Sequence, residues 1–196
     1  MSTSSTDPAT TARDSYHHGD LRAALLASAT ALLESGEPFS LRAVARAAGV
    51  SATAPYRHFA DRDALESALA VEGFEDLGSR LAAAGEVSSP EDLAGLAVVY
   101  VFFALDRPAV FRLMFGQECD DANDARVLAA EQLRDHLRTA IAAVFPAADL
   151  DALALGAWGV VHGLAFLHLD GKLPADPRAE VEARVRAALS ALLAAG

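Results

Sequence analysis

The sequence lacks the paired cysteines that a disulfide requires, because Cys119 is the only cysteine among its 196 residues. An intrachain disulfide is therefore excluded, and the composition is consistent with a reducing compartment such as the cytoplasm. Residues 1–15 are polar and contain no apolar segment of the kind that signal peptides carry. We therefore expect neither a signal peptide nor a membrane anchor in this segment.

Residues that favour strands are also scarce. Aromatic residues make up 7% of the sequence, and β-branched residues occur mainly in a few clusters, whereas alanine and leucine dominate. No segment alternates apolar and polar residues over the length of a strand. The apolar fraction of 53% is sufficient for a core. We therefore expect an all-α fold of about nine helices.

The motifs of catalytic and metal sites are missing as well. The sequence contains neither a glycine-rich phosphate loop nor the nucleophile elbow of hydrolases, so we expect no enzymatic activity. For Cys119 an incidental thiol is a simpler interpretation than a redox sensor. The histidines and the acidic run lack the spacing of metal ligands, so we expect no metal and no cofactor. These residues are His17, His18, His136, His168, Asp120, Asp121 and Asp124.

One long segment carries no charge. Residues 152–169 contain no Asp, Glu, Lys or Arg, and this length raises the question of a transmembrane helix. The segment contains two histidines and three glycines, and it is flanked by Asp149, Asp151 and Asp170 rather than by basic anchors. We therefore predict a helix buried between protein layers and no membrane partner.

The negative charge is confined to one part of the chain. Residues 1–60 contain five Arg and five acidic residues, whereas residues 61–196 contain 11 Lys or Arg and 22 Asp or Glu. The second part therefore accounts for the whole net charge of −11. A neutral N-terminal part with clustered Arg and His can still bind the phosphates of DNA.

Capping residues and glycines predict where the helices begin and end. In the N-terminal part we expect helices from near Asp20 to Glu34, from Ser40 to Gly49, and from Ser51 to near Phe59. A long helix then begins at Asp61. In the C-terminal part we expect helices beginning at residues 89–90, 108, 124, about 152 and 176, with loops over residues 116–123 and 171–176.

Residues 40–59 have the pattern of a helix-turn-helix. Gly49 can adopt the left-handed conformation that a tight turn needs, and Ser51 is expected to cap the second helix and to expose its N-terminus to phosphate. The following residues, from Ala52 to Pro55, are small enough to approach the major groove, where the Thr53 methyl can contact a thymine. The expected donors at the edge of the groove and to the phosphates are Tyr56, Arg57, His58, Arg42 and Arg46.

Four segments resemble, in order and in register over residues 16–69, the DNA-binding domain of TetR-family transcriptional regulators. They are YHHGDLR (16–22), FSLRAVA (39–45), AGVSATAPYRHF (48–59) and FADRDAL (59–65). Two positions depart from the family pattern. Pro55 stands where the family more often has an aliphatic residue, and Arg62 stands where it usually has a phosphate-binding Lys, so the charge is kept with a different geometry.

The C-terminal part also resembles a subgroup of this family that carries a Trp-His-Gly signature. The segments AWGVVHG (157–163) and PAVFRLMF (108–115) carry this resemblance. The family fold implies that the last two helices form a four-helix dimer interface and that the preceding helices enclose an effector cavity. We therefore expect an N-terminal arm over residues 1–15, a DNA-binding domain over 16–60, and an effector-binding and dimerisation domain over 61–196.

The resemblance and the residue pattern together assign three sets of site residues. Each aromatic residue could equally well fill the core or line a pocket. For His162, a hydrogen-bonded histidine of the interior is at least as good an interpretation as a residue that orients a ligand. The expected DNA contacts are Tyr16, Arg42, Ser51, Thr53, Ala54, Pro55, Tyr56, His58 and Arg62. The expected effector pocket comprises Phe102, Phe103, Phe111, Met114, Phe115, Trp158, His162 and Phe166. The expected dimer interface comprises Val161, Leu164, Val181, Val185, Leu189 and Leu192.

The function implied is that of a ligand-responsive transcriptional regulator, and we expect it to repress rather than activate transcription. A homodimer would bind a palindromic operator in double-stranded DNA, close to the bacterial nucleoid in the cytoplasm, and a small hydrophobic effector would release it. The alternative is a helical module that binds a small molecule or a protein and whose helix-turn-helix is vestigial. The acidic net charge supports this alternative, and salt-dependent binding to DNA discriminates between the two.

Overall fold

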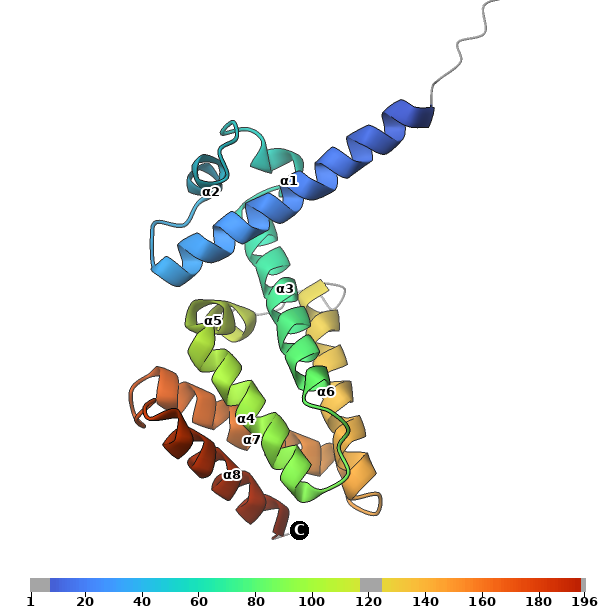
Figure 1. The fold of residues 1–196 in the computed structure, drawn as a ribbon, viewed down its shortest axis with the longest axis vertical. Helices are drawn as coiled ribbons and strands as arrows, with labels where there is room; N and C mark the ends of the chain where they lie inside the picture. The colour runs from blue at the N-terminus through green and yellow to red at the C-terminus, as the bar shows by residue number, and fades with distance from the viewer. Residues whose placement is uncertain (1–7, 117–124, 195–196) are drawn as a thin grey trace, which may run out of the picture. The chain divides into compact units, whose positions relative to one another are not determined.

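The computed structural model describes residues 8–116 and 125–194, with the side chains of residues 21–116 and 125–194 (Figure 1). These residues form eight α-helices and one short 3₁₀ helix, and no strand. The elements are α1 (Pro8–Ser35), α2 (Leu41–Ala47), η1 (Pro55–Arg57), α3 (Arg62–Ala83), α4 (Pro90–Asp106), α5 (Pro108–Gly116), α6 (Ala125–Val144), α7 (Leu150–Leu169) and α8 (Arg178–Ala194). The all-α prediction is therefore confirmed.

One boundary differs clearly from the sequence prediction. The first helix begins at Pro8 rather than near Asp20, so residues 8–15 of the expected arm are helical. No apolar stripe marks this part of the sequence, but proline is favoured at the first position of a helix. The expected loop over residues 117–123, with Cys119 and the acidic run, lies outside the described residues.

The expected helix from Ser51 to Phe59 is wrong. Residues 51–54 form turns, and only Pro55–Arg57 form a 3₁₀ helix. Pro55 has no N–H to donate to the carbonyl of Ser51, and its ring crowds the preceding turn, so an α-helix cannot run through this position undisturbed. Most of the remaining hydrogen bonds join residues three apart, as Ala54 N to Ser51 O at 3.0 Å and His58 N to Pro55 O at 2.9 Å, and one from Phe59 N to Pro55 O at 2.9 Å joins residues four apart.

The chain divides into two compact units, Met1–Leu69 and Ala70–Gly196. The division falls inside α3, so this single helix contributes residues to both units. In the first unit, α1 packs against α2, and α2 packs against η1. Its core is a set of fully buried apolar side chains, comprising Leu25, Leu26, Ala29, Val44, Phe59, Leu65 and Leu69.

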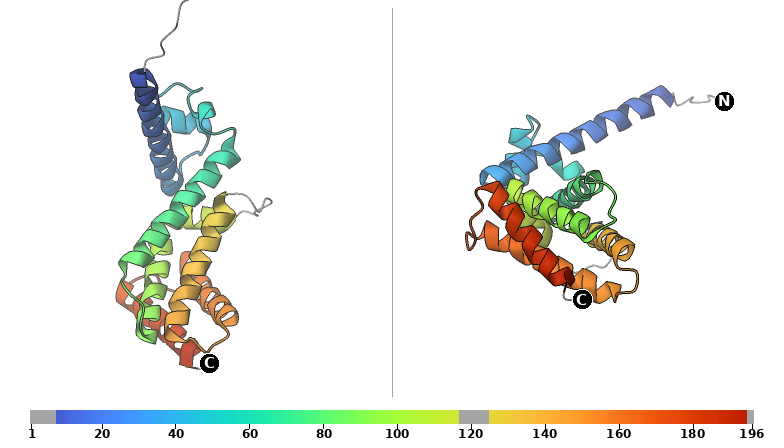
Figure 2. Two further views of the ribbon diagram at one scale, coloured as in Figure 1. Left: turned by 90° about the vertical axis from the view of Figure 1, so that its right-hand side faces the viewer. Right: turned by 60° about the horizontal axis from the view of Figure 1, so that its bottom comes forward.

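In the second unit α4 is the central helix. It packs against α7 and α8 (Figure 1), and Figure 2 shows α8 running beside it, while α6 packs mainly against α7. Ser89 begins α4 with a capping box: its hydroxyl accepts a hydrogen bond from Asp92 N at 3.2 Å, and a carboxylate oxygen of Asp92 accepts one from Ser89 N at 2.9 Å. This confirms the cap that the sequence predicts. The chain then turns by 104° between α4 and α5.

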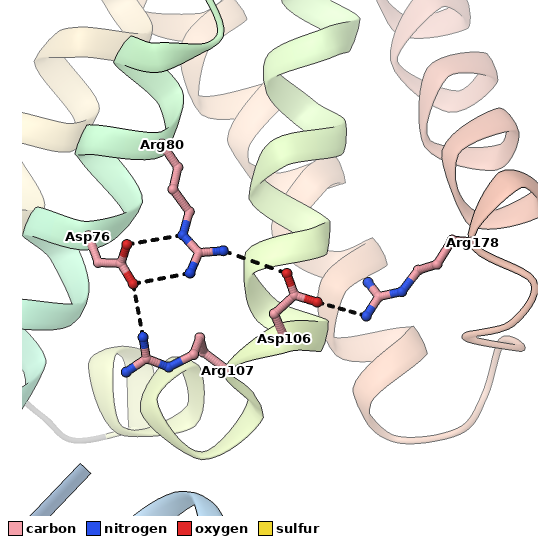
Figure 3. Close-up of polar contacts among 5 residues, drawn as sticks. All are labelled: Asp76, Arg80, Asp106, Arg107 and Arg178. Carbon is pink, nitrogen blue, oxygen red and sulfur yellow. Dashed lines mark hydrogen bonds and ion pairs between the residues drawn. The ribbon is translucent and has the colours of Figure 1, made fainter. Parts of the chain in front are cut away.

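A network of ion pairs joins α3, the end of α4 and the start of α8 (Figure 3). Asp76 of α3 accepts hydrogen bonds from Arg80 Nε and from Arg107 Nη1, each at 3.0 Å. Asp106 lies 3.6 Å from Arg80 Nη1 and accepts a hydrogen bond from Arg178 Nη2 at 2.8 Å. Arg80 therefore bridges the carboxylates of two helices. This bridge holds the C-terminal part of α3 against the corner between α4 and α5.

Helix α7 is apolar on more than its buried face. It is long and apolar enough to cross a membrane, and 22% of its most apolar stretch is buried within the chain. The buried positions, Ala157, Val161, Ala165 and His168, form one stripe. The rest of the helix is more exposed, so the predicted burial between protein layers holds for only one face within a single chain.

Candidate functional site

The first candidate site is the surface of the turn between α2 and η1. The Oγ of Ser40 accepts a hydrogen bond from Ala43 N at 3.1 Å and caps α2, as the sequence predicts. Gly49 has φ +69°, so the left-handed turn predicted at this residue is confirmed as well. The two features fix the start of α2 and the turn that follows it, and both segments carry exposed side chains.

The segment that comprises α2, the turn and η1 carries positive charge without any carboxylate. Residues 38–60 contain three arginines and neither Asp nor Glu. Arg42 and Arg46 lie four residues apart on α2, and both side chains are exposed, as is that of Arg57. Ser51, Thr53 and Tyr56 of the same segment are exposed as well, Tyr56 by 52%. A net positive, donor-rich surface of this kind suits the phosphates and base edges of DNA.

Two of the predicted DNA contacts, Pro55 and Ser51, differ from the expectation. Pro55 is buried in the first unit instead of facing outward. Ser51 does not cap a helix: its hydroxyl lies 3.3 Å from that of Thr53, and Ala54, partly buried, is the residue that precedes η1. The phosphate site expected at a helix N-terminus therefore does not form. His58 is partly buried, and the side chain of Tyr16 is outside the described side chains.

Arg62 begins α3 and is held by two neighbours. Its Nε donates a hydrogen bond to Glu66 Oε1 at 2.7 Å, and its guanidinium lies 5.5 Å from the centre of the Phe39 ring. Glu66 is buried, whereas 62% of the Arg62 side chain is exposed. The guanidinium is thus oriented by its neighbours and keeps an exposed side for a phosphate.

The second candidate site is an apolar cavity inside the second unit. Its volume is about 320 Å³, which is within the range of small-molecule sites. Side chains from α3, α4, α5, α6, α7 and α8 line it. The lining residues are Phe74, Leu81, Leu93, Leu96, Ala97, Tyr100, Met114, Phe115, Arg126, Val127, Ala130, Leu133, Arg134, His136, Leu137, Ile141, Ala157, Trp158, Val161, Leu189 and Leu193.

Three of the eight residues predicted for the pocket line this cavity: Met114, Phe115 and Trp158. The other five lie behind its wall. Phe103 and Phe111 are fully buried core residues, and Phe102 lies under the guanidinium of Arg178, 5.0 Å from the ring centre. The last two, His162 and Phe166, pack on Phe111 with ring centres 5.7 and 5.6 Å from it.

Sequence reasoning missed the contribution of α3 and α6. Phe74 and Leu81 belong to a helix that was predicted only as a long rod. On α6, Val127, Ala130, Leu133, Leu137 and Ile141 recur every three or four residues, which is the period of one helical face. That period is visible in the sequence and indicates one apolar face of a helix, but it does not indicate a cavity.

Tyr100 lines the cavity and is hydrogen-bonded to two other polar side chains. The indole N–H of Trp158 donates to the Tyr100 hydroxyl at 3.4 Å, and the hydroxyl lies 2.9 Å from Nδ1 of His162. Burial raises the pKa of Tyr100 above its usual range, so the phenol keeps its proton. Burial also lowers the pKa of His162, which favours the neutral ring. A protonated phenol can therefore donate to a neutral imidazole nitrogen.

The predicted dimer residues also divide into two groups. Val161, Val181, Val185 and Leu189 are buried within the chain, Val181 and Val185 completely, so they have no surface left for a partner. The apolar stripe of α8 faces α4, which is why its sequence pattern does not mark an interface. Leu164 and Leu192 are partly exposed. On the exposed side of α7 lie Gly156, Gly159, Val160, Gly163 and Leu167, and on that of α8 lie Ala183, Ala187 and Ala191.

Comparisons with known proteins agree with this architecture. Residues 93–192 match the family described as "Tetracyclin repressor-like, C-terminal domain". No curated protein matches the sequence. A protein of unknown function from Rhodococcus sp. RHA1 is 36% identical, with a TM-score of 0.76 over 89% of this chain and 95% of that chain.

Two further solved structures share the fold. A TetR-family transcriptional regulator from Streptomyces coelicolor is 22% identical, with a TM-score of 0.72 over 90% of this chain and 82% of that chain. A TetR-like transcriptional regulator from Rhodococcus sp. RHA1 is 18% identical, with a TM-score of 0.66 over 90% and 97%. The Trp-His-Gly subgroup stays a prediction. The family match covers half of the chain, and the chain therefore belongs to the TetR family of transcriptional regulators.

Proposed function

We propose that this protein is a homodimeric, ligand-responsive repressor that binds a palindromic operator and is released by a small apolar or amphipathic effector. The observation that carries this proposal is the presence, in one chain, of an acid-free arginine surface around a helix-turn and a separate apolar cavity of about 320 Å³. The first suits DNA and the second suits a small molecule.

A second copy of the chain is the partner that we assign to the exposed side of α7 and α8. Three glycines on α7 have open space where a side chain would begin, and small residues of this kind let helix backbones approach closely. An apolar helix that is 22% buried in its own chain gains from being covered. The dimer would present two DNA-binding surfaces, as a two-fold operator requires.

We assign the coupling between effector and DNA to α3. This helix supplies Phe74 and Leu81 to the cavity wall, and its other end, from Arg62 to Leu69, belongs to the first unit. Asp76 and Arg80 tie it to the end of α4. An effector that favours a different position of α3 shifts the population away from the DNA-binding state.

The test is DNA binding as a function of salt, on the intergenic DNA next to the gene. Arg42→Ala should weaken binding to all sequences and reduce the slope of log affinity against log salt by about one. Thr53→Val should instead change which operator variant is preferred. Arg186→Ala, which changes an exposed arginine of the second unit, is the matched control and should leave binding unchanged.

The alternative is a ligand-binding helical module that does not act on DNA. The shortness of η1, which replaces the expected recognition helix, favours this alternative. If wild-type protein and Arg42→Ala bind the intergenic DNA equally weakly and without salt dependence, the alternative holds and the proposal of a DNA-binding regulator is rejected.

A further inference from the structure

We propose that the cavity of the second unit binds an elongated apolar molecule with one anionic head, a monocarboxylate with a chain of about eight carbons, and that Arg134 holds the head. This inference uses the proposed function only in taking the cavity as the effector site. The class of ligand follows from the side chains that line the cavity, from the position of Arg134 at one end of the cavity, and from the cavity volume.

The polar side chains of the cavity are hydrogen-bond donors. Among the described lining residues they are Arg126, Arg134 and His136 of α6, Tyr100 of α4 and Trp158 of α7. The arginines have no acceptor. The indole N–H of Trp158 is already engaged with the Tyr100 hydroxyl, and that hydroxyl with Nδ1 of His162, so the guanidinium of Arg134 is the donor that we assign to the ligand. Apart from these five side chains, the described lining is apolar. The cavity therefore suits a ligand that accepts hydrogen bonds at one point.

The charges of the lining have one sign. Residues 61–196 contain twice as many acidic as basic residues, yet the charged residues among the described lining are two arginines and no carboxylate. An isolated cation brought into this cavity would lose its hydration without gaining a counter-charge, whereas an anion gains one. The lining thus selects an anion over a cation.

Arg134 lies where the apolar cavity meets a polar hollow between α6 and α7. This hollow is lined by Glu131, Arg134, Asp135, Leu137, Arg138, Asp151, Ala154, Leu155 and Trp158, so Arg134, Leu137 and Trp158 belong to both spaces. The Arg134 side chain is 58% exposed and lies 3.5 Å from Glu131, a surface pair that contributes little. A ligand carboxylate can replace Glu131 as its partner, with the apolar body directed toward Phe115.

The volume sets the length of the ligand. A water molecule occupies about 30 Å³ in the liquid. If each non-hydrogen atom takes about the same volume, a cavity of about 320 Å³ accommodates roughly ten of them. An eight-carbon carboxylate has this size. The aromatic rings of Phe74, Phe115 and Trp158 provide the apolar surface, with ring centres 5.3 Å apart for the first two and 6.5 Å for the last two.

The experiment compares three probes that share an eight-carbon chain and differ in the charge of the head: octanoate, 1-octanol and octyltrimethylammonium. Binding to the full-length protein is followed by the fluorescence of Trp158, the only tryptophan, which lines the cavity. We expect octanoate to bind about tenfold tighter than octanol, the effect of one hydrogen bond to a charged group, and the cation to bind most weakly.

Two variants locate the head. Arg134→Gln should remove the tenfold preference for octanoate while leaving octanol affinity unchanged, which also shows that the variant is folded. Arg138→Gln is the matched control, because Arg138 lines only the polar hollow and pairs with Asp151 at 2.7 Å. Its preference for octanoate should equal that of the wild type.

The outcomes separate this inference from the proposed function. Equal affinity for the three probes, a preference for the cation, no binding, or an unchanged octanoate preference in Arg134→Gln would overturn the inference, whatever the protein does on DNA. If octanoate binds with the expected Arg134 dependence but leaves DNA affinity unchanged, the ligand class stands and release by this effector fails.

Discussion

Gly73 of α3 approaches Met114 of α5 so closely that a Cβ atom at Gly73 would lie 2.7 Å from the Met114 sulfur and 2.8 Å from Cγ1 of Val110. Real Cβ atoms do not approach other heavy atoms at such distances. Met114 also lines the cavity. This contact therefore makes the position of α3 sensitive to the wall of the effector site, and glycine is required here by space rather than by backbone conformation.

Gly73→Ala should consequently destabilise the protein. Overpacking costs about 1–3 kcal/mol, and the better helix propensity of alanine offsets about 1 kcal/mol of this. Gly78→Ala on the same helix is the matched control, because no atom lies within 4 Å of the added Cβ; it should stabilise by about 0.5–1 kcal/mol. Unfolding in urea measures both. Equal effects of the two substitutions would contradict the close contact.

Ser40→Ala should destabilise the first unit by about 1 kcal/mol, because the hydroxyl caps α2 through Ala43 N. Ser51→Ala is the control: the sequence predicts a cap there as well, but the Ser51 hydroxyl contacts Thr53 instead. Its substitution should leave the free energy of unfolding nearly unchanged. If thermal unfolding shows the two variants to be equally destabilised, the structure of the turn is wrong.

The stability of the protein should fall as the pH drops below about 6.5. Burial lowers the pKa of His162 from its usual 6.5, so the unfolded chain binds a proton there more readily than the native one. Stability is therefore fully present above pH 6.5 and is lost as the pH falls toward the native pKa. The loss is at most about 1.4 kcal/mol per pH unit for this one site.

Urea unfolding of the wild type and of His162→Gln at several pH values between 5 and 8 measures this effect. The variant should lose less stability over that range. Burial also lowers the pKa of His168, so a smaller loss of the same sign should remain in the variant. Identical pH profiles for the two proteins would show that His162 is not the responsible group.

Leu167→Asp should convert the proposed dimer into a monomer. The side chain is 43% exposed on α7, and a charge buried there in an interface would have no partner. Leu128→Asp, at a 50% exposed leucine on α6, is the matched control and should remain dimeric. Sedimentation at micromolar concentration distinguishes the two. A wild-type monomer, or a dimer in Leu167→Asp, would reject the assigned face.

Much of the fold was determined by local chemistry that is visible in the sequence. Ser40, Gly49 and Ser89 set caps and a turn through their own hydrogen-bonding groups and backbone freedom, and each has the predicted role in the structure. The error at residues 51–59 is local too. Pro55 lies inside the expected helix from Ser51 to Phe59, where its missing N–H and its ring leave only one 3₁₀ turn.

The sites depended on tertiary packing. The periodicity of an apolar stripe shows that one face of a helix is buried, but not what covers it, so Val181 and Val185 were assigned to a partner when they face α4. Cores and pockets use the same residue types. Only the packing of six helices decides that Phe115 borders empty space whereas Phe111, four residues earlier on the same helix, is enclosed on every side.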